Sequence, residues 1–257
     1  MTEHVTVADE GGIRTIRFNR PDKKNALTRA MYTAAAEALE SGDTDNAVRI
    51  YILGGQDGVF TAGNDLMDFM EAPPHIGAAE TPPVERFMRA LLTAKKPVIA
   101  EVDGVAVGIG TTLLMHCDLA YASDRAIFQT PFVDLALAPE YASSLFFPAR
   151  LGRSPASELL LLGDSWGAAR AKETGLISDV FSANDLPGEV RKRAESLAAK
   201  SPGALRQAKA LMTAEPETVS DRIVREGGIF ADMLQSPEFA EAATAFMERR
   251  KPDFSKF

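Results

Sequence analysis

A glycine-rich turn between two apolar stretches limits the fold more than any other feature of this sequence. Residues 97–102 (PVIAEV) are apolar and β-branched, which predicts a buried strand. Residues 104–110 (GVAVGIG) then lead into an apolar run that predicts a buried helix. A helix that begins after a strand and a glycine turn directs free backbone N–H groups and the positive end of its dipole to one point. Such a point binds a phosphate or stabilises an oxyanion that forms on a substrate carbonyl.

The glycine pattern itself argues against a dinucleotide site. That fingerprint needs Gly-x-Gly-x-x-Gly after the strand. Gly108 and Gly110 are present, but Leu113 stands where the third glycine would be, and the stretch has no P-loop lysine. A dinucleotide-dependent oxidoreductase is therefore a weak hypothesis. A tight helix–strand crossing that needs only small residues remains an alternative.

A second glycine turn favours the oxyanion interpretation. Residues 60–66 (FTAGNDL) again pass from an apolar stretch into a glycine turn. Two N–H groups from separate loops can converge on one carbonyl oxygen, and they stabilise it most when it becomes negative. Asp65 is expected to cap a helix over residues 66–71 and so to steady this turn. Spacing alone does not show that the two turns meet.

The order of the expected elements predicts an α/β domain with a parallel or mixed sheet. Residues 13–18 alternate as a half-buried strand does, Thr28 is a plausible N-cap for a helix to about residue 41, and residues 48–53 predict a buried strand. Further elements are expected along the rest of the chain: a helix over residues 84–94, strands over 118–122 and 126–128, an irregular apolar stretch over 131–148, helices over 154–162 and 166–174, and a charged helical region from about 186 that ends with a helix over 237–249. A composition shift near residue 190 is the one candidate boundary, between residues 1–190 and 191–257.

Charge and apolar patterning exclude several function classes. The chain has 28 Lys and Arg against 36 Asp and Glu, for a formal charge of −8, and its pI is about 5.1. No domain-wide basic face is available, so nucleic acid is not expected as a partner. No stretch of roughly 18 apolar residues is present, so a membrane partner is not expected either.

Cysteine and histidine usage predicts a cytoplasmic protein without a metal site. Cys117 is the single cysteine, which excludes an internal disulfide and fits a reducing compartment. The first residues contain no apolar segment of a secretory signal. His4, His75 and His116 are far apart and lack the spacing of metal ligands.

Four motifs in order resemble the crotonase (enoyl-CoA hydratase/isomerase) superfamily. They are residues 19–27 (NRPDKKNAL), residues 60–66, residues 104–110 with KPVIA before them, and residues 245–252 (AFMERRKP). The resemblance covers essentially the whole chain. It implies an α/β, crotonase-like spiral of ββα units over residues 1–190, which holds the active site. It also implies that residues 191–257 form a C-terminal helical trimerisation region that completes the CoA site of a homo-oligomer, a trimer or dimer of trimers.

The resemblance also implies a substrate and the residues that bind it. The substrate is an acyl-CoA thioester whose carbonyl becomes an enolate, and the backbone N–H groups of Asn64 and Ile109 form the oxyanion hole. Coenzyme A is part of the substrate, so no separate cofactor is expected. The basic residues Arg20, Lys23 and Lys24, with Lys251 from a neighbouring subunit, are implied as phosphate contacts, although a solvated surface is an alternative for each. Further contacts are implied for Ala26, Ala62, Gly63, Asp65, Leu66, Gly108, Phe132, Pro139 and Phe246.

The carboxylates that face the thioester decide the reaction within this family. Hydratases of the family use two glutamates, and the corresponding positions here hold Thr112 and Phe132. Residues 130–132 (TPF), followed by Pro139 and Glu140, instead resemble the peroxisomal-type Δ3,Δ2-enoyl-CoA isomerase subgroup. That resemblance implies Glu140 as the single catalytic base. The subgroup usually has a glycine after this glutamate, whereas this sequence has Tyr141.

One base suits an allylic isomerisation, because C2 loses a proton and C4 gains one on the same face of the substrate. The apolar residues Phe132, Leu135, Leu137 and Phe146 are expected to surround Glu140 and to raise its pKa by burial. Asp134 is the second-choice acid on the same loop. From the residues alone, an exposed loop acid is an alternative for Glu140.

The sequence therefore predicts an enzyme, a Δ3,Δ2-enoyl-CoA isomerase. Two alternatives stay open: enoyl-CoA hydration or another reaction of the same superfamily, and a non-catalytic acyl-CoA-binding relative.

Overall fold

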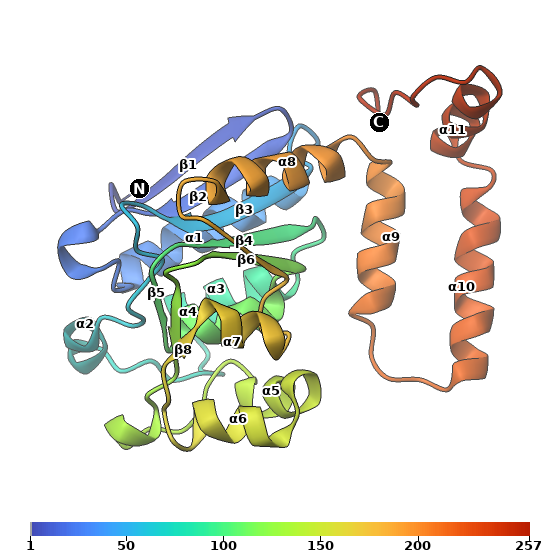
Figure 1. Cartoon of the computed structure of the whole chain (residues 1–257). Helices are drawn as coiled ribbons and strands as arrows, with labels where there is room; N and C mark the ends of the chain where they lie inside the picture. The colour runs from blue at the N-terminus through green and yellow to red at the C-terminus, as the bar shows by residue number, and fades with distance from the viewer. Residues whose placement is uncertain (1) are drawn as a thin grey trace.

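Two β-sheets and their covering helices form the larger body of the molecule, and three C-terminal helices extend from it (Figure 1). The structure is a computed structural model that describes residues 2–257. The strands are β1 (Val5–Glu10), β2 (Ile13–Phe18), β3 (Ile50–Gly55), β4 (Val98–Val102), β5 (Val105–Val107), β6 (Leu119–Ser123), β7 (Ile127–Gln129), β8 (Trp166–Gly167) and β9 (Asp179–Phe181). The α-helices are α1 (Arg29–Thr44), α2 (Leu66–Glu71), α3 (Pro83–Leu92), α4 (Ile109–Thr112), α5 (Ser143–Leu151), α6 (Arg153–Leu160), α7 (Ala168–Glu173), α8 (Leu186–Ala198), α9 (Pro202–Met212), α10 (Val219–Met233) and α11 (Pro237–Met247). Short 3₁₀ turns are η1 (Pro21–Lys23), η2 (Leu113–His116) and η3 (Val133–Leu135).

The sheet topology confirms the predicted α/β class. The larger sheet has the strand order β1-β2-β3-β4-β6-β9, with one antiparallel pair, β1 with β2, and parallel pairing elsewhere. The smaller sheet has the order β5-β7-β8. β1 was not predicted, because only Val5 of its six residues is buried and the apolar alternation is therefore weak. Gly11 and Gly12 join it to β2 with positive φ angles of 60° and 79°.

The alternation along β3 shows why the large sheet is covered on both faces. Tyr51 and Leu53 point into the core that α1 and α3 complete, while Ile50 and Ile52 point into the core beneath α8. Both sets are buried, which is typical of a parallel sheet between two helical layers. Thr28 caps α1, as predicted, and accepts a hydrogen bond from the Met31 N–H.

Two predictions between residues 131 and 174 are wrong. The stretch 131–148 was expected to be irregular, yet α5 begins at Ser143 and contains Pro148. The usual sequence signals of a helix are missing there. Pro148 lies inside the helix, and the N-cap residue, Ala142, has no side chain that could accept a capping hydrogen bond. The helix expected to begin at Trp166 begins at Ala168 instead, because Trp166 pairs with Phe128 as strand β8.

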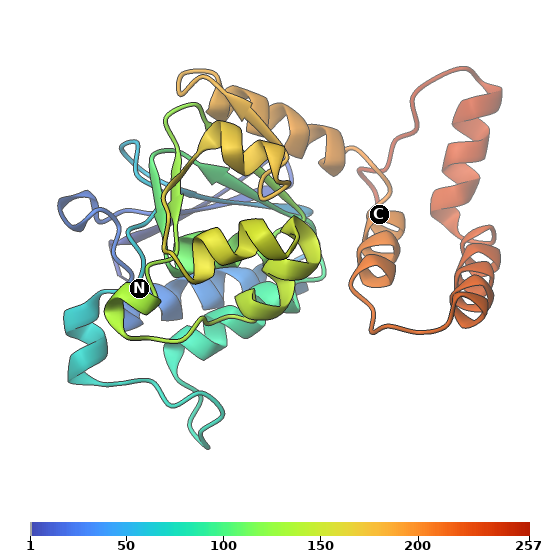
Figure 2. The same cartoon turned by 60° about the horizontal axis from the view of Figure 1, so that its bottom comes forward.

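The last three helices differ from the rest because much of their apolar surface is exposed. Helix α8 packs on the large sheet through Leu186, Val190 and Ala194. Helices α9 to α11, called the arm below, extend away from the larger body in both views (Figure 1; Figure 2). Large side chains of the arm are mostly exposed, among them Met212, Ile223, Val224, Phe230, Phe246 and Met247. The division of the chain at residues 190 and 191 stays a prediction.

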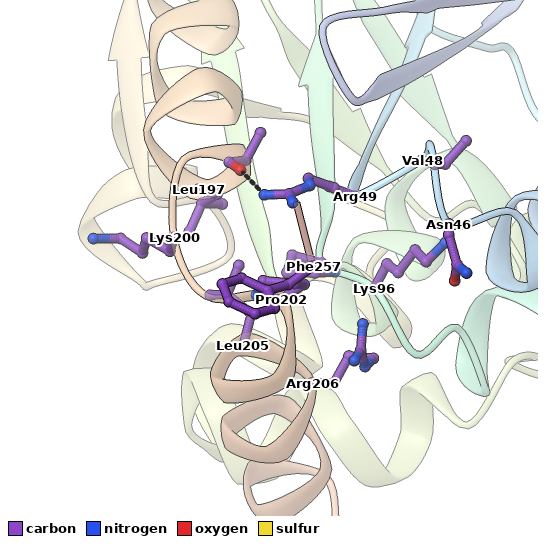
Figure 3. A pocket seen from close by; sticks show the side chains of 12 residues that line it. Asn46, Val48, Arg49, Lys96, Leu197, Lys200, Pro202, Leu205, Arg206 and Phe257 are labelled. Carbon is purple, nitrogen blue, oxygen red and sulfur yellow. Dashed lines mark hydrogen bonds between the residues drawn. The ribbon is translucent and has the colours of Figure 1, made fainter. Parts of the chain in front are cut away.

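A narrow crevice marks where the arm and the C-terminal tail meet the body. Arg49 donates to the Ala198 carbonyl at 2.8 Å (Figure 3). It also contacts the Phe254 carbonyl. Lys96, Lys200 and Arg206 line the same crevice (Figure 3). This crevice lies beside the N-terminal end of β3, which follows Arg49. The site described below forms beyond the C-terminal end of the same strand. Within residues 2–257, every helix is too short or too polar to cross a bilayer.

Candidate active site

The two glycine turns that the sequence predicts lie against each other. Thr61 pairs with Ala106 as an isolated parallel bridge. The Thr61 N–H donates to the Val105 carbonyl at 2.9 Å, and the Val107 N–H donates to the Thr61 carbonyl at 3.0 Å. These backbone hydrogen bonds fix the relative position of two loops that are more than 40 residues apart in the sequence.

Glycine is required at this contact because the two turns approach so closely. A Cβ atom at Gly63 would lie 2.8 Å from the Val107 carbonyl oxygen, and Gly63 has a φ of +92°. A Cβ atom at Gly110 would lie 2.6 Å from Cγ2 of Thr61. A side chain at either position would push the turns apart. The glycines therefore set the spacing of the backbone groups that follow each of them.

The backbone N–H groups of Asn64 and Ile109 lie beside this contact. Neither has a hydrogen-bond acceptor within residues 2–257. Around Asn64, the neighbouring groups are used: Leu27 N–H donates to the Gly63 carbonyl at 2.8 Å, and Asp65 N–H donates to the Leu27 carbonyl at 2.9 Å. Ile109 is the first residue of α4, so its N–H has no partner inside the helix. Free backbone N–H groups are the kind of donor that stabilises a carbonyl oxygen as it becomes negative.

Side chains steady the turn that carries Asn64. The Tyr32 hydroxyl of α1 donates to the Asn64 side-chain oxygen. Asp65 caps α2, as predicted, and accepts from the N–H groups of Met67 and Asp68 at 3.1 and 3.2 Å. Asp65 also pairs with Arg20 at 2.6 Å, and these contacts hold the pKa of Asp65 below its usual value.

Glu140 is a half-buried residue whose carboxyl group has one engaged and one free oxygen. The Thr112 hydroxyl donates to Oε1 at 2.6 Å, while Oε2 is buried without a hydrogen-bond partner. Burial raises the pKa of Glu140 to about 7, although the hydrogen bond from Thr112 acts in the opposite direction. Thr112 and Ile109 lie on the same short helix, α4. This helix therefore links a free N–H group to a carboxyl that is able to exchange a proton near neutral pH.

The surroundings of Glu140 differ in part from the prediction. Phe132 is buried, and Phe146 is half-buried and packs edge-on against His116, whose ring stacks on Tyr141. Leu135 and Leu137 were expected to cover the acid, but they are 49% and 53% exposed. The reason is that η3 carries this segment outward, with Ala136 in the left-handed conformation at φ 55°. Asp134, the second-choice acid, is also exposed.

The loop after Glu140 contains two residues in the left-handed conformation that are not glycine. Tyr141 has a φ of 53° and Ala142 a φ of 57°. Such residues cost roughly 1–2 kcal/mol each. The Tyr141 ring stacks on His116, with centroids 3.7 Å apart and planes at 15°. No local sequence pattern indicates this pair, because the two residues are 25 positions apart in the chain.

The residues implied as CoA contacts do not all meet in one chain. Lys23 and Lys24 are exposed, and the Lys24 carbonyl accepts from the Ala62 N–H at 2.9 Å, which joins this loop to the Asn64 turn. Phe246 and Lys251 are exposed on the arm and its tail, apart from that loop (Figure 1). Of the other implied contacts, Ala26, Ala62, Gly108 and Pro139 are half-buried, Gly63 is buried and Leu66 is exposed.

The described part of the chain contains no set of side chains that could bind a metal ion. No group of three or more His, Cys, Asp or Glu side chains there is placed to hold a metal ion. The Cys117 thiol is buried, and burial raises its pKa to about 12, so it is not poised as a nucleophile.

Comparison with known proteins places this site in a large family. Residues 8–256 match the family model of enoyl-CoA hydratase/isomerase. Enoyl-CoA delta isomerase 2 of Rattus norvegicus is 39% identical over 214 residues, which are 81% of this chain and 54% of that protein. This chain thus spans about half the length of the rat protein.

Relatives with other names are similar over nearly the whole chain. The 2,3-dehydroadipyl-CoA hydratase of Escherichia coli is 30% identical over 249 residues, which are 96% of this chain and 97% of that protein. A solved structure described as an enoyl-CoA hydratase/carnithine racemase from Magnetospirillum magneticum is 44% identical, with full coverage of both chains and a TM-score of 0.94.

Proposed function

This chain belongs to the enoyl-CoA hydratase/isomerase family and is an enzyme of that family, and from this premise we propose that it converts 3-enoyl-CoA thioesters into 2-enoyl-CoA thioesters. Relatives include proteins named isomerase and proteins named hydratase, so the site has to supply the distinction.

One observation carries the proposal. The site contains a single free carboxyl oxygen, on Glu140, together with the free N–H groups of Asn64 and Ile109. Glu140 Oε2 is buried and has no partner, and the Glu140 pKa of about 7 makes it a base at neutral pH. The two positions where hydratases of this family carry glutamates hold Thr112 and Phe132. One base is sufficient for an allylic proton shift, whereas hydration uses a second acid to handle water.

The proposed reaction assigns each part of the site one task. The N–H groups of Asn64 and Ile109 donate to the thioester oxygen and stabilise the charge that forms there. Glu140 Oε2 removes a proton from C2, which leaves a dienolate, and the protonated acid then returns a proton to C4. The double bond moves from C3–C4 to C2–C3, no water is consumed, and Glu140 ends in its starting ionised form.

We propose further that the exposed lysines Lys23 and Lys24 contact the phosphates of CoA, and that the arm assembles the chain into a trimer or a dimer of trimers. Exposed apolar side chains such as Phe230 and Phe246, at 68% and 85% exposure, support association of the arm. Lys251 would then reach the CoA of a neighbouring subunit. Light scattering after size-exclusion chromatography measures the mass, and a monomer at micromolar concentration contradicts this part of the proposal.

Two substrates separate the proposed activity from its alternatives. With a 3-enoyl-CoA, the rise in absorbance of the conjugated thioester is expected. With a 2-enoyl-CoA, little 3-hydroxyacyl-CoA is expected. Fast formation of the water adduct with no isomerisation favours the hydratase alternative. Binding of CoA esters by calorimetry with no turnover of either substrate favours the non-catalytic alternative.

A further inference from the structure

The backbone directly after Glu140 adopts a conformation that its residues disfavour. Tyr141 and Ala142 both have positive φ angles, 53° and 57°. Consecutive non-glycine residues persist in this region only where the surrounding structure holds them, and such sites cluster where geometry matters for function. The contacts that hold Tyr141 therefore identify the groups that set the course of this loop.

Contacts from two other elements hold Tyr141 in this conformation. Its hydroxyl donates to the Met88 carbonyl of α3 at 2.7 Å. Its carbonyl lies 2.9 Å from His116 Nε2 at the end of η2, and since a carbonyl only accepts, Nε2 carries the proton. Its ring stacks on the His116 ring, and the edge of that imidazole meets Phe146, with ring centroids 5.2 Å apart.

Glu140 is connected to Tyr141 through a single peptide unit. The Glu140 carbonyl accepts from the Ser143 N–H at 3.0 Å and from the Ser143 hydroxyl at 2.7 Å. Together with the bond from Thr112 to Oε1, these contacts define both ends of the Glu140 residue. A rotation of the Tyr141 backbone would turn the Glu140 carboxyl away from Thr112.

We propose that Tyr141 and His116 are positioning residues, which brace the loop so that Glu140 Oε2 stays buried and directed at the reacting carbons. The proposal rests on the proposed function for the identity of the reaction, but the position of the carboxyl is a separate, measurable property. His116 acts through the Tyr141 carbonyl and ring, and Tyr141 acts through its covalent link to Glu140.

Titratable neighbours of Glu140 stay uncharged at neutral pH. Burial raises the pKa of Tyr32 and of Tyr141, and the charge on Glu140 raises both further. Burial lowers the pKa of His116 below its usual value. Changing Tyr141 or His116 to an uncharged residue therefore alters packing and hydrogen bonds rather than the charge beside Glu140.

Three variants test the brace, that is, the contacts by which Tyr141 and His116 hold the loop after Glu140. Tyr141→Phe removes the bond to Met88, His116→Phe keeps an aromatic ring but removes the N–H donor, and Tyr141→Gly accepts positive φ while removing the ring. We expect kcat on a 3-enoyl-CoA to fall about tenfold for Tyr141→Phe and for His116→Phe, and further for Tyr141→Gly, with KM nearly unchanged.

The matched control is Tyr51→Phe, because the Tyr51 hydroxyl donates to the Leu39 carbonyl at 2.9 Å, far from Glu140 in the chain. This control is expected to lower thermal stability and to leave kcat unchanged.

A titration of Glu140 by carbon-13 NMR, with the resonance assigned through Glu140→Gln, decides the proposal without turnover. In Tyr141→Gly, the Glu140 pKa is expected to fall by about one unit as water reaches the carboxyl. If wild type fails to isomerise 3-enoyl-CoA, the proposed function is overturned, and the NMR titration still tests the brace. If Tyr141→Gly and His116→Phe both keep the wild-type Glu140 pKa, the brace is overturned, whatever the activity.

Discussion

The turns that present Asn64 and Ile109 differ from the loop that presents Glu140 in what fixes their backbone. In the turns, glycines allow close approach, and main-chain hydrogen bonds from Thr61 to Val105 and from Val107 to Thr61 hold the two segments together. In the loop, Tyr141 and Ala142 adopt positive φ without glycine, and Tyr141 is held by the His116 side chain and by the bond from its own hydroxyl to the Met88 carbonyl. The comparison indicates that main-chain contacts join the two turns of the proposed donor half, where side chains only steady the Asn64 turn, whereas side-chain contacts hold the loop of the proposed base.

Removing the charge at the base tests the loop half most severely. Glu140→Gln keeps the size and the hydrogen bond to Thr112 but cannot take a proton. We expect kcat to fall about 10³-fold, within the range typical of a general base. The assay is conversion of a 3-enoyl-CoA under saturating substrate. Asp134→Asn, on the same loop but exposed, is the matched control and should keep wild-type activity. Full activity of Glu140→Gln would contradict the assignment of the base.

The turn half is tested by adding one carbon atom. In Gly63→Ala, the Cβ would lie 2.8 Å from the Val107 carbonyl oxygen, which separates the turns and moves the Asn64 N–H. We expect kcat to fall about 10²-fold, as for loss of one oxyanion donor. Gly77→Ala is the control, because Gly77 also has positive φ, +81°, yet a Cβ there meets nothing within 4 Å. Equal activity of the two variants would show that the contact between the turns does not set the donor position.

Burial of Glu140 also predicts a cost in stability that depends on pH. The pKa is about 7 in the folded protein and near 4.5 in the unfolded chain, so the folded state holds the proton more tightly. The free energy of unfolding of wild type should therefore fall as pH rises from about 4.5 to 7, and Glu140→Gln should lack this fall. Well above pH 7, the variant is expected to be more stable than wild type by about 3 kcal/mol.

Urea unfolding at pH 4 and pH 8 measures this difference. A stability gap that is the same at both pH values would show that Glu140 is not buried in its charged form. The same ionisation predicts that kcat/KM rises with pH through about 7, because the base works only when it is deprotonated.

The smallest effect is expected from loss of the hydrogen bond between Thr112, on the helix that begins with Ile109, and Glu140. Thr112→Val removes the donor to Glu140 Oε1 and keeps the shape of the side chain. Since this bond lowers the Glu140 pKa, its loss should shift the pH midpoint of kcat/KM upward and reduce kcat about tenfold. Thr130→Val, which removes a 2.7 Å bond to the Leu159 carbonyl, is the control and should leave the midpoint in place. An unchanged midpoint in Thr112→Val would indicate that the bond does not act on the carboxyl.

Local signals in the sequence were sufficient for most of the fold. Apolar alternation located β2 and the buried run of β3, and the caps Thr28 and Asp65 located the starts of α1 and α2. These signals act over a few residues, so they survive without knowledge of the tertiary structure. β1 and α5 lacked such signals, because one is mostly exposed and the other contains Pro148.

By itself, the sequence determined the α/β class and the two glycine turns, because glycine spacing and apolar periodicity are local properties. Glu140 was singled out by the resemblance of residues 130–140 to a known subgroup. Only the tertiary structure decided that the two turns touch, that Thr112 engages Glu140, and that Tyr141 is braced by His116 and Met88. Each of these contacts joins residues 25 or more positions apart, and no local pattern encodes which distant side chain will fill a given space. The resemblance to a known family thus implied Glu140 as the base, a role that stays a proposal, whereas the contacts that hold this residue were decided by the tertiary structure.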